Sequence, residues 1–173
     1  MKTLYIVRHA KSSWKDWSLD DFDRPLNRRG KRDAPFMGAK LREMGVRPDL
    51  LLASPAKRAK KTAKHIAKQL GYKKENIVFN HEMYDTSYND ILEIVQEQDD
   101  KVEKLMIFGH NPEFTFLCNE LCDYDLYNLP TTGIFCVEFE VDKWSDIQVQ
   151  TGKFVFFEYP KKYFPKEEPK TQT

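Results

Sequence analysis

Residues 4–9 read Leu-Tyr-Ile-Val-Arg-His, a short apolar run that ends on a cation and an imidazole. The β-branched and aromatic side chains of residues 4–7 predict a buried strand. Arg8 is a fixed cation, and His9 is the one side-chain type that can be a neutral nucleophile near neutral pH. In an open parallel sheet, ligands bind just beyond the carboxyl ends of the strands. A strand that ends in two solvated polar residues would look the same, so the rest of the sequence has to decide.

The composition is that of a folded globular chain, with 40% hydrophobic residues among 173. This length suits one domain with a full core. The 28 Lys and Arg nearly balance the 27 Asp and Glu, so we expect neither nucleic acid nor a membrane as a partner. No apolar stretch approaches the roughly 20 residues of a membrane span, and residues 1–10 predict a strand rather than a signal peptide. We therefore expect a cytoplasmic protein.

The cysteines and acidic residues predict neither a disulfide framework nor a metal site. Cys118, Cys122 and Cys136 cannot all pair, and they lack zinc-type spacing to any histidine. Buried free thiols fit the reducing cytosol. The sequence also contains no cluster of carboxylates suited to a divalent cation. We expect no metal and no cofactor.

Strands alternate with helices along the chain. Apolar runs predict strands at residues 4–7, 50–53, 77–79, 104–108, 134–141 and 147–159. Apolar residues at helical spacing predict helices at residues 28–44, 55–70, 87–98 and 113–122. This order is typical of βαβ units around a largely parallel sheet, with antiparallel strands late in the chain. We predict one α/β domain over residues 1–159, a three-layer α/β/α sandwich with a mostly parallel central sheet, and a surface tail over residues 160–173.

Local signals predict where the first two helices begin. Asn27 is the predicted N-cap of the first helix, but Pro35 removes a helical donor, so we expect a kink or a later start near Asp33. In the second helix, Ser54 is the predicted cap and Pro55 suits the first turn. The outer face of this second helix is either a solvated surface or a docking surface for an acidic partner. It carries Lys57, Lys60, Lys61, Lys64 and Lys68.

Polar side chains of catalytic type follow three of the predicted strands. Arg8 and His9 follow the first, Arg58 lies one turn into the helix after the second, and His110 follows the fourth. Neighbouring parallel strands would bring these four side chains around one crevice, and helix N-termini would point N–H groups at it. Two guanidiniums and two imidazoles make a phosphate-sized anion site. Coincidence at three strand ends is hard to accept, so we favour a site over solvated strand ends.

The segments that carry these residues resemble the histidine phosphatase superfamily, which has the phosphoglycerate-mutase-like fold. Residues 8–10, Arg-His-Ala, look like its signature, with Ala in place of the commoner Gly. Residues 54–63 resemble its second motif, and residues 109–112 its third. Further short segments are similar to the SixA-like branch, the phosphohistidine phosphatases: residues 23–26, 29–30 and 130–131. The resemblance runs from residue 4 to about residue 157, and the combination of motifs is specific.

The resemblance implies a role for each of the four central side chains. His9 would attack phosphorus and form a phosphohistidine intermediate that water then hydrolyses. For this His9 must be neutral, which the adjacent Arg8 favours, and its other ring nitrogen should bond an acceptor such as a backbone carbonyl. Arg8 and Arg58 would hold the phosphoryl oxygens, and His110 would donate to the transferring phosphoryl group. With these fixed cations, no metal is needed.

Three more residues are candidates for the site. Many relatives place an acidic proton donor after the third strand, where this chain has Glu82. Glu82 is therefore either the proton donor or a solvated loop residue, and both interpretations stay open. Arg24 is expected at the pocket rim and Asn111 at the start of the helix behind His110, both as substrate-binding residues.

The spacing of the motifs predicts an open site. No long insertion separates them, and a loop with Trp14 and Trp17 lies beside the first strand end, which suits a phosphoprotein better than an enclosed metabolite. We therefore expect a metal-independent phosphohistidine phosphatase that acts on a phosphorylated protein. One alternative is a small-molecule phosphomonoesterase or a phosphoglycerate-mutase-like enzyme, which would show a closed, cation-rich pocket outside the phosphate site. A non-catalytic phospho-binding module is a further alternative, although binding alone would need neither His9 nor His110.

Overall fold

The computed structural model describes residues 1–164, and its middle layer is a six-stranded sheet in the order β3-β2-β4-β1-β5-β6. The strands are β1 (Lys2–Arg8), β2 (Leu50–Ala53), β3 (Val78–Phe79), β4 (Lys104–Gly109), β5 (Ile134–Phe139) and β6 (Lys153–Glu158). The first four are parallel to one another, whereas β5 runs antiparallel to β1 and β6 antiparallel to β5. The predicted sheet, mostly parallel with antiparallel pairing late in the chain, is confirmed.

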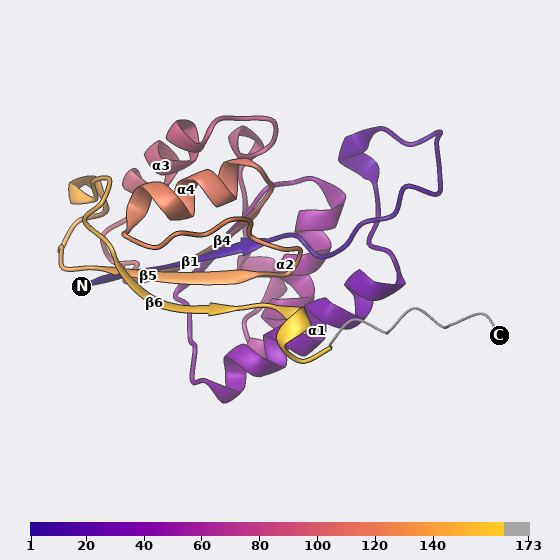
Figure 1. The fold of residues 1–173 in the computed structure, drawn as a ribbon, viewed down its shortest axis with the longest axis horizontal. Coiled ribbons are helices and arrows are strands. Elements are labelled where there is room, and N and C mark those ends of the chain that lie inside the picture. The colour runs from indigo at the N-terminus through magenta and orange to yellow at the C-terminus, as the bar shows by residue number, and fades with distance from the viewer. Residues whose placement is uncertain (165–173) are drawn as a thin grey trace.

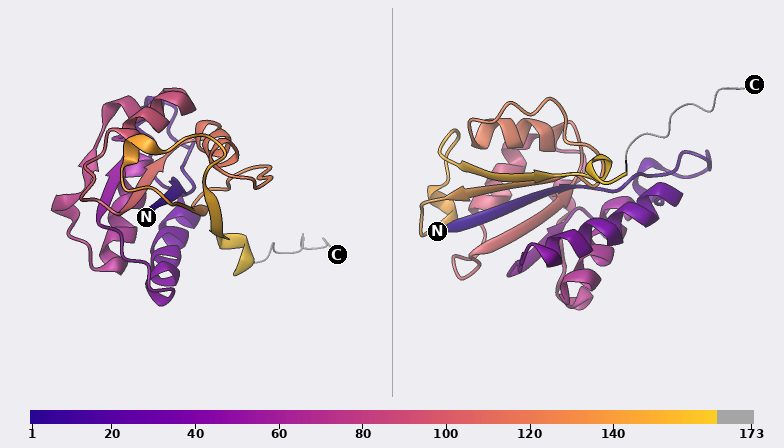
Figure 2. Two further views of the ribbon diagram at one scale, coloured as in Figure 1. Left: turned by 90° about the vertical axis from the view of Figure 1, so that its left-hand side faces the viewer. Right: turned by 60° about the horizontal axis from the view of Figure 1, so that its bottom comes forward.

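Helices cover both faces of this sheet. They are α1 (Arg28–Glu43), α2 (Lys57–Leu70), α3 (Tyr88–Gln96) and α4 (Glu113–Leu121). Figure 1 shows α3 and α4 on one side of the sheet and α1 and α2 on the other, and Figure 2 shows the same three layers from two more directions. Alternate residues of β1 enter the two cores, Leu4 and Ile6 towards α3 and α4, Tyr5 and Val7 towards α1 and α2. The three-layer α/β/α sandwich is confirmed.

The first helix begins earlier than Pro35 suggests. The Asn27 side chain accepts a hydrogen bond from the Gly30 N–H at 2.9 Å, so α1 starts at Arg28 and includes Pro35. The predicted later start near Asp33 is wrong. The proline removes one backbone hydrogen bond, and the packing of the buried apolar face of α1 against α2 and the sheet compensates for it.

The second helix begins later than predicted, at Lys57, and Ser54 is not its N-cap. The Ser54 hydroxyl instead accepts a hydrogen bond from the Ala56 N–H within the turn that joins β2 to α2. The alanines on the inner face of α2, Ala59, Ala63 and Ala67, are fully buried. Gly71 ends the helix in the left-handed conformation, with φ of 69°.

The start of the predicted tail packs on the domain. Pro160 is buried, and the Phe164 ring lies 4.6 Å from the Phe36 ring of α1. The Arg32 guanidinium lies 4.0 Å over the same Phe164 ring. A tail that wanders from Pro160 is therefore wrong for residues 160–164, because Pro160 is buried and the Phe164 ring contacts Phe36 and Arg32 of α1. Residues 165–173 of the predicted tail lie outside the described residues.

The cysteines are buried in the core. Cys118, Cys122 and Cys136 are all free, and burial raises the pKa of Cys136 to about 12. They therefore act as small apolar core residues, as expected. Within residues 1–164, none of the helices has the length and apolar character needed to cross a membrane.

Candidate active site

The carboxyl ends of three parallel strands meet at one open pocket of about 350 Å³. Since β4 lies between β1 and β2, the residues after these strands face a common space. The structure brings Arg8, His9, Arg58 and His110 together there, as the strand ends predict. The lining residues are Arg8, His9, Lys11, Ser12, Trp14, Asp21, Arg24, Arg58, His110, Asn111 and Thr131.

His9 lies at the floor of this pocket, with 7% of the residue exposed. Its Nδ1 is 2.7 Å from the carbonyl oxygen of Ala10. A carbonyl oxygen only accepts, so Nδ1 carries the proton and the Nε2 lone pair is free. Burial lowers the pKa of His9 well below its usual value, and the charges of Arg58 and Arg8 act in the same direction. At neutral pH, His9 is therefore an uncharged imidazole with a free nitrogen.

Each of the two guanidiniums has one buried N–H donor that no described residue accepts from. Arg8 donates from Nη1 to the Leu129 carbonyl oxygen, and Arg58 donates from both Nη atoms to Asp21. The Nε atoms of Arg8 and Arg58 are buried and have no hydrogen-bond partner within residues 1–164. Buried donors are normally paired, so these two N–H groups fit a ligand with several oxygen acceptors, such as a phosphoryl group.

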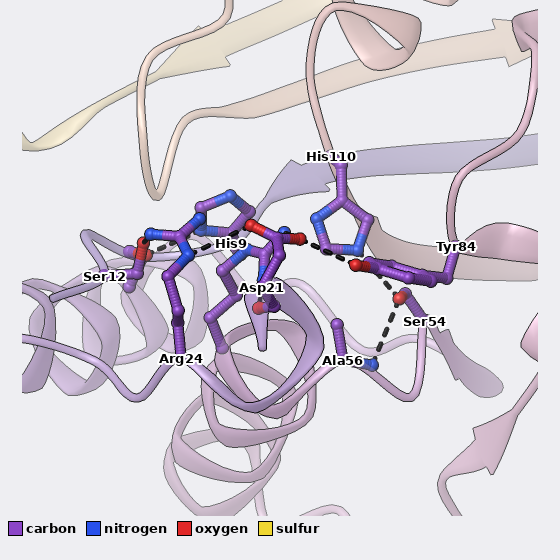
Figure 3. A network of polar contacts seen from close by, with 10 residues as sticks. His9, Ser12, Asp21, Arg24, Ser54, Ala56, Tyr84 and His110 are labelled. Atoms are coloured by element: carbon purple, nitrogen blue, oxygen red, sulfur yellow. Dashed lines mark hydrogen bonds and ion pairs between the residues drawn. The ribbon is translucent and has the colours of Figure 1, made fainter. Parts of the chain in front are cut away.

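Ser54 contacts and orients the His110 ring. The sequence predicts Ser54 only as a helix cap and gives no sign of this contact. The His110 Nε2 lies 2.8 Å from the Ser54 hydroxyl, which already accepts from the Ala56 N–H. The hydroxyl can donate its own proton to Nε2, and in that arrangement the proton of the neutral ring lies on Nδ1. That Nδ1 is buried without a partner in the described part of the chain, and Figure 3 shows it on the side of His9 and Asp21. His110 can thus donate to a group bound beside His9.

We expect His110 to stay neutral at pH 5. Burial and the nearby Arg58 charge lower its pKa to about 3, whereas an ordinary histidine has a pKa of about 6.5. Nuclear magnetic resonance of the ring nitrogens during an acid titration measures this directly, with a His110→Gln variant to assign the signal. A ring that gains its proton near pH 6.5 would contradict this geometry.

Asp21 is a pocket residue that the sequence pattern does not single out. Its carboxylate accepts hydrogen bonds from Arg58 at 2.9 Å, from Arg24 at 3.0 Å and from the Tyr84 hydroxyl at 2.7 Å (Figure 3). Partial burial raises its pKa, but the hydrogen bonds from Tyr84 and Arg58 outweigh this and bring the pKa to about 2. The only signal in the sequence is a loop with four acids, at positions 16, 20, 21 and 23.

Arg24 and Asn111 both line the pocket, in the places expected for them. Arg24 donates to the Ser12 hydroxyl at 2.7 Å, and its guanidinium lies 3.5 Å over the ring of Trp14. The Asn111 side chain accepts from the Thr115 N–H in the first turn of α4. Its amide also donates to the Leu129 carbonyl, the same acceptor that Arg8 uses. Both side chains hold pocket loops in position.

Glu82 is exposed and lies outside the pocket lining of the described residues. It sits on a short 3-10 turn, His81–Met83, where its N–H donates to the Asn80 side chain. Tyr84, directly after this turn, contacts two residues of the pocket: its hydroxyl donates to Asp21, and its ring centroid lies 5.6 Å from that of His110. The position of Glu82 therefore favours the solvated-loop interpretation over a proton donor.

Comparison with known proteins agrees with this arrangement. The family model of the histidine phosphatase superfamily (branch 1) matches residues 4–115. The crystal structure of a SixA protein from Agrobacterium tumefaciens, assigned as a phosphohistidine phosphatase, has a TM-score of 0.79 and 27% identity. The match covers 92% of this chain and 98% of that one.

Two curated relatives match over shorter segments. An uncharacterized chloroplastic protein of Arabidopsis thaliana is 33% identical over 64% of this chain and 54% of its own length. A 2,3-bisphosphoglycerate-dependent phosphoglycerate mutase of Bartonella tribocorum is 33% identical over 52% of this chain and 45% of the mutase. The chain thus spans about half the length of these two relatives.

The matched segment contains the three strand ends that form the pocket. The family match and the SixA structure together support a phosphatase. Because the family model covers more than half of the chain, this protein belongs to the histidine phosphatase superfamily (branch 1), and its fold is that of the SixA-like members.

Proposed function

We propose that this protein is a phosphohistidine phosphatase that removes the phosphoryl group from a phosphorylated protein through a covalent intermediate on His9. The observation that carries the proposal is the state of His9, buried and neutral, with a free Nε2 beside two guanidiniums. A binding module needs cations but no free nucleophile. The fold shared with the SixA protein of Agrobacterium tumefaciens supports the substrate class.

The geometry suggests two chemical steps. In the first, the His9 Nε2 lone pair attacks phosphorus, a P–N bond forms, and the bond to the leaving group breaks with its electron pair on the leaving atom. In the second, water attacks the same phosphorus, the bond to His9 breaks, and inorganic phosphate leaves. The phosphoryl oxygens take the free donors of Arg8 and Arg58 in both steps.

His110 is placed to assist both steps. The centroids of the His9 and His110 rings are 5.3 Å apart, so a phosphoryl group on His9 lies within reach of the His110 Nδ1–H. A hydrogen bond donated by the Ser54 hydroxyl to the His110 Nε2 selects the tautomer in which this nitrogen is a donor. The negative charge that grows on the phosphoryl oxygens in the transition state then meets three donors held in place before the reaction.

The openness of the pocket favours a protein substrate over a small metabolite. Trp14 is 68% exposed and Trp17 is 95% exposed, both on the loop that borders the pocket. Exposed aromatic side chains are suited to contact with a partner surface. A small-molecule phosphatase or mutase is the second candidate function, because the phosphoglycerate mutase of Bartonella tribocorum is a relative.

A comparison of substrates tests the proposal. We expect phosphate release from a phosphohistidine-bearing protein to exceed that from 3-phosphoglycerate and from a phosphoserine peptide by at least about 100-fold in kcat/KM, or roughly 2.7 kcal/mol in the transition state. Preference for 3-phosphoglycerate would instead establish the small-molecule alternative. Binding of phosphohistidine without release of phosphate would establish the non-catalytic module.

We expect turnover to be independent of divalent cations. Within residues 1–164, no group of three or more His, Cys, Asp or Glu side chains is arranged to hold a metal, and Arg8 and Arg58 supply positive charge at the pocket. Excess chelator should leave the rate unchanged, whereas vanadate, a mimic of a five-coordinate phosphoryl group, should inhibit. Loss of activity on chelation that a divalent cation restores would overturn the metal-free mechanism.

A further inference from the structure

Asp21 is the one carboxylate among the described residues that line the pocket, and the two chemical steps above do not use it. It contacts Arg58 through the two Nη atoms, which donate to its backbone carbonyl and to its carboxylate. The Nε of Arg58 is left without a partner in residues 1–164. This Nε is the Arg58 donor that a phosphoryl oxygen would take without displacing Asp21.

The position of Asp21 in the pocket indicates which part of the substrate it contacts. His9 is 7% exposed at the pocket floor, whereas the Asp21 side chain is 47% exposed at the mouth. Attack in line from the floor drives the leaving group towards the mouth. Asp21 therefore lies on the side from which the leaving group departs.

The carboxylate is held in a fixed orientation and keeps its charge. Arg24 and Tyr84 hold it from two further directions, which Figure 3 shows on either side of Asp21. Its pKa of about 2 leaves it ionised at neutral pH. Three side-chain donors occupy three of the roughly four acceptor positions of a carboxylate, so one remains for a ligand. An anion at this place attracts a leaving group that donates a hydrogen bond and repels an acidic one.

We propose that Asp21 determines substrate specificity in two ways: it accepts a hydrogen bond from the substrate phosphohistidine, which binds as an imidazolium with its second ring nitrogen protonated, and it disfavours acidic leaving groups such as phosphoglycerate. The inference rests on the proposed function. When the P–N bond breaks, its electron pair goes to the substrate nitrogen that carried phosphorus. The other ring nitrogen keeps its proton, so the product is neutral imidazole. Asp21 stays ionised throughout and transfers no proton.

The test compares Asp21→Asn with the matched variant Asp23→Asn on three substrates: a phosphohistidine protein, p-nitrophenyl phosphate and 3-phosphoglycerate. Asp23 is exposed on the same short 3-10 helix, and its side chain has no hydrogen bond or ion pair with the described residues. We expect Asp21→Asn to lower kcat/KM for phosphohistidine about tenfold relative to p-nitrophenyl phosphate, a size typical of a charged hydrogen bond. It should raise kcat/KM for 3-phosphoglycerate, and Asp23→Asn should change neither ratio.

Each other outcome counts against the inference. Equal losses on all three substrates would show that Asp21 only positions Arg58, and equal gains would show that it competes with the phosphoryl group. A ratio of kcat/KM for phosphohistidine to kcat/KM for p-nitrophenyl phosphate that is the same in Asp21→Asn as in the wild type would overturn this inference alone. A wild-type protein that prefers 3-phosphoglycerate, or that releases phosphate from none of the three, would overturn the proposed function as well.

Discussion

Replacing His9 with alanine should abolish phosphate release, with kcat/KM lower by at least roughly 10³-fold, a typical loss for a missing nucleophile. The reason is that the variant has no nitrogen to form the covalent bond to phosphorus. The fold should survive, because the ring makes its one hydrogen bond to the adjacent Ala10 carbonyl and lies at a strand end. Rates on a phosphohistidine protein, together with a thermal melt followed by circular dichroism, measure both effects.

A second histidine provides the matched control for His9. His81 is exposed and outside the pocket lining of the described residues, so His81→Ala should keep wild-type rates. The nearly isosteric His9→Asn keeps a polar group at the pocket floor and should be as inactive as His9→Ala. Near-normal turnover by either His9 variant would remove His9 from the role of nucleophile.

Arg58→Lys should cause the second largest loss, about 10²- to 10³-fold in kcat, the usual effect of removing one transition-state donor. The Arg58 guanidinium holds Asp21 through both Nη atoms and keeps Nε for a phosphoryl oxygen. A lysine ammonium is a point charge that cannot reproduce this planar arrangement of donors. Because the substitution retains the positive charge, a loss of kcat would show that the planar arrangement of the guanidinium donors is required.

The same helix offers a control for Arg58. Lys61 is exposed on the outer face of α2, away from the pocket, so Lys61→Ala should keep both kcat and vanadate inhibition. Arg58→Lys should bind vanadate more weakly in parallel with its loss of kcat. Wild-type kcat in Arg58→Lys would mean that Arg58 does not contact the phosphoryl group.

The fold was predictable because its central strands are buried on both faces. The apolar run of β1 has no polar interruption, since Leu4 and Tyr5 enter different cores, and such runs alternating with helices are typical of a parallel sheet. The predictions that were wrong rested on local sequence signals, and tertiary contacts override those signals. Pro35 sits inside α1 because the packing of that helix compensates for one lost hydrogen bond, and the half-buried Phe164 packs on α1 because its ring contacts Phe36.

The residues of the site were predictable only where the order of the strands determines their position. Arg8, His9 and His110 follow the ends of adjacent parallel strands, so the strand order alone brings them together. Asp21 and Tyr84 come from loops, which have no periodicity to show which side chain turns inward. Four acids share the Asp21 loop, and Glu82 and Tyr84 lie two residues apart on another loop, so the sequence pattern does not show which of them faces the site.

Trapping the covalent intermediate tests the central claim most directly. Enzyme mixed with a phosphohistidine protein is quenched within one turnover in alkaline detergent, because the P–N bond of phosphohistidine is labile to acid, and tandem mass spectrometry then locates the phosphate. We expect phosphate on His9, formed at least as fast as the steady-state rate, and none in His9→Ala. A fully active enzyme that carries no phosphate, or carries it on His110, would contradict the account.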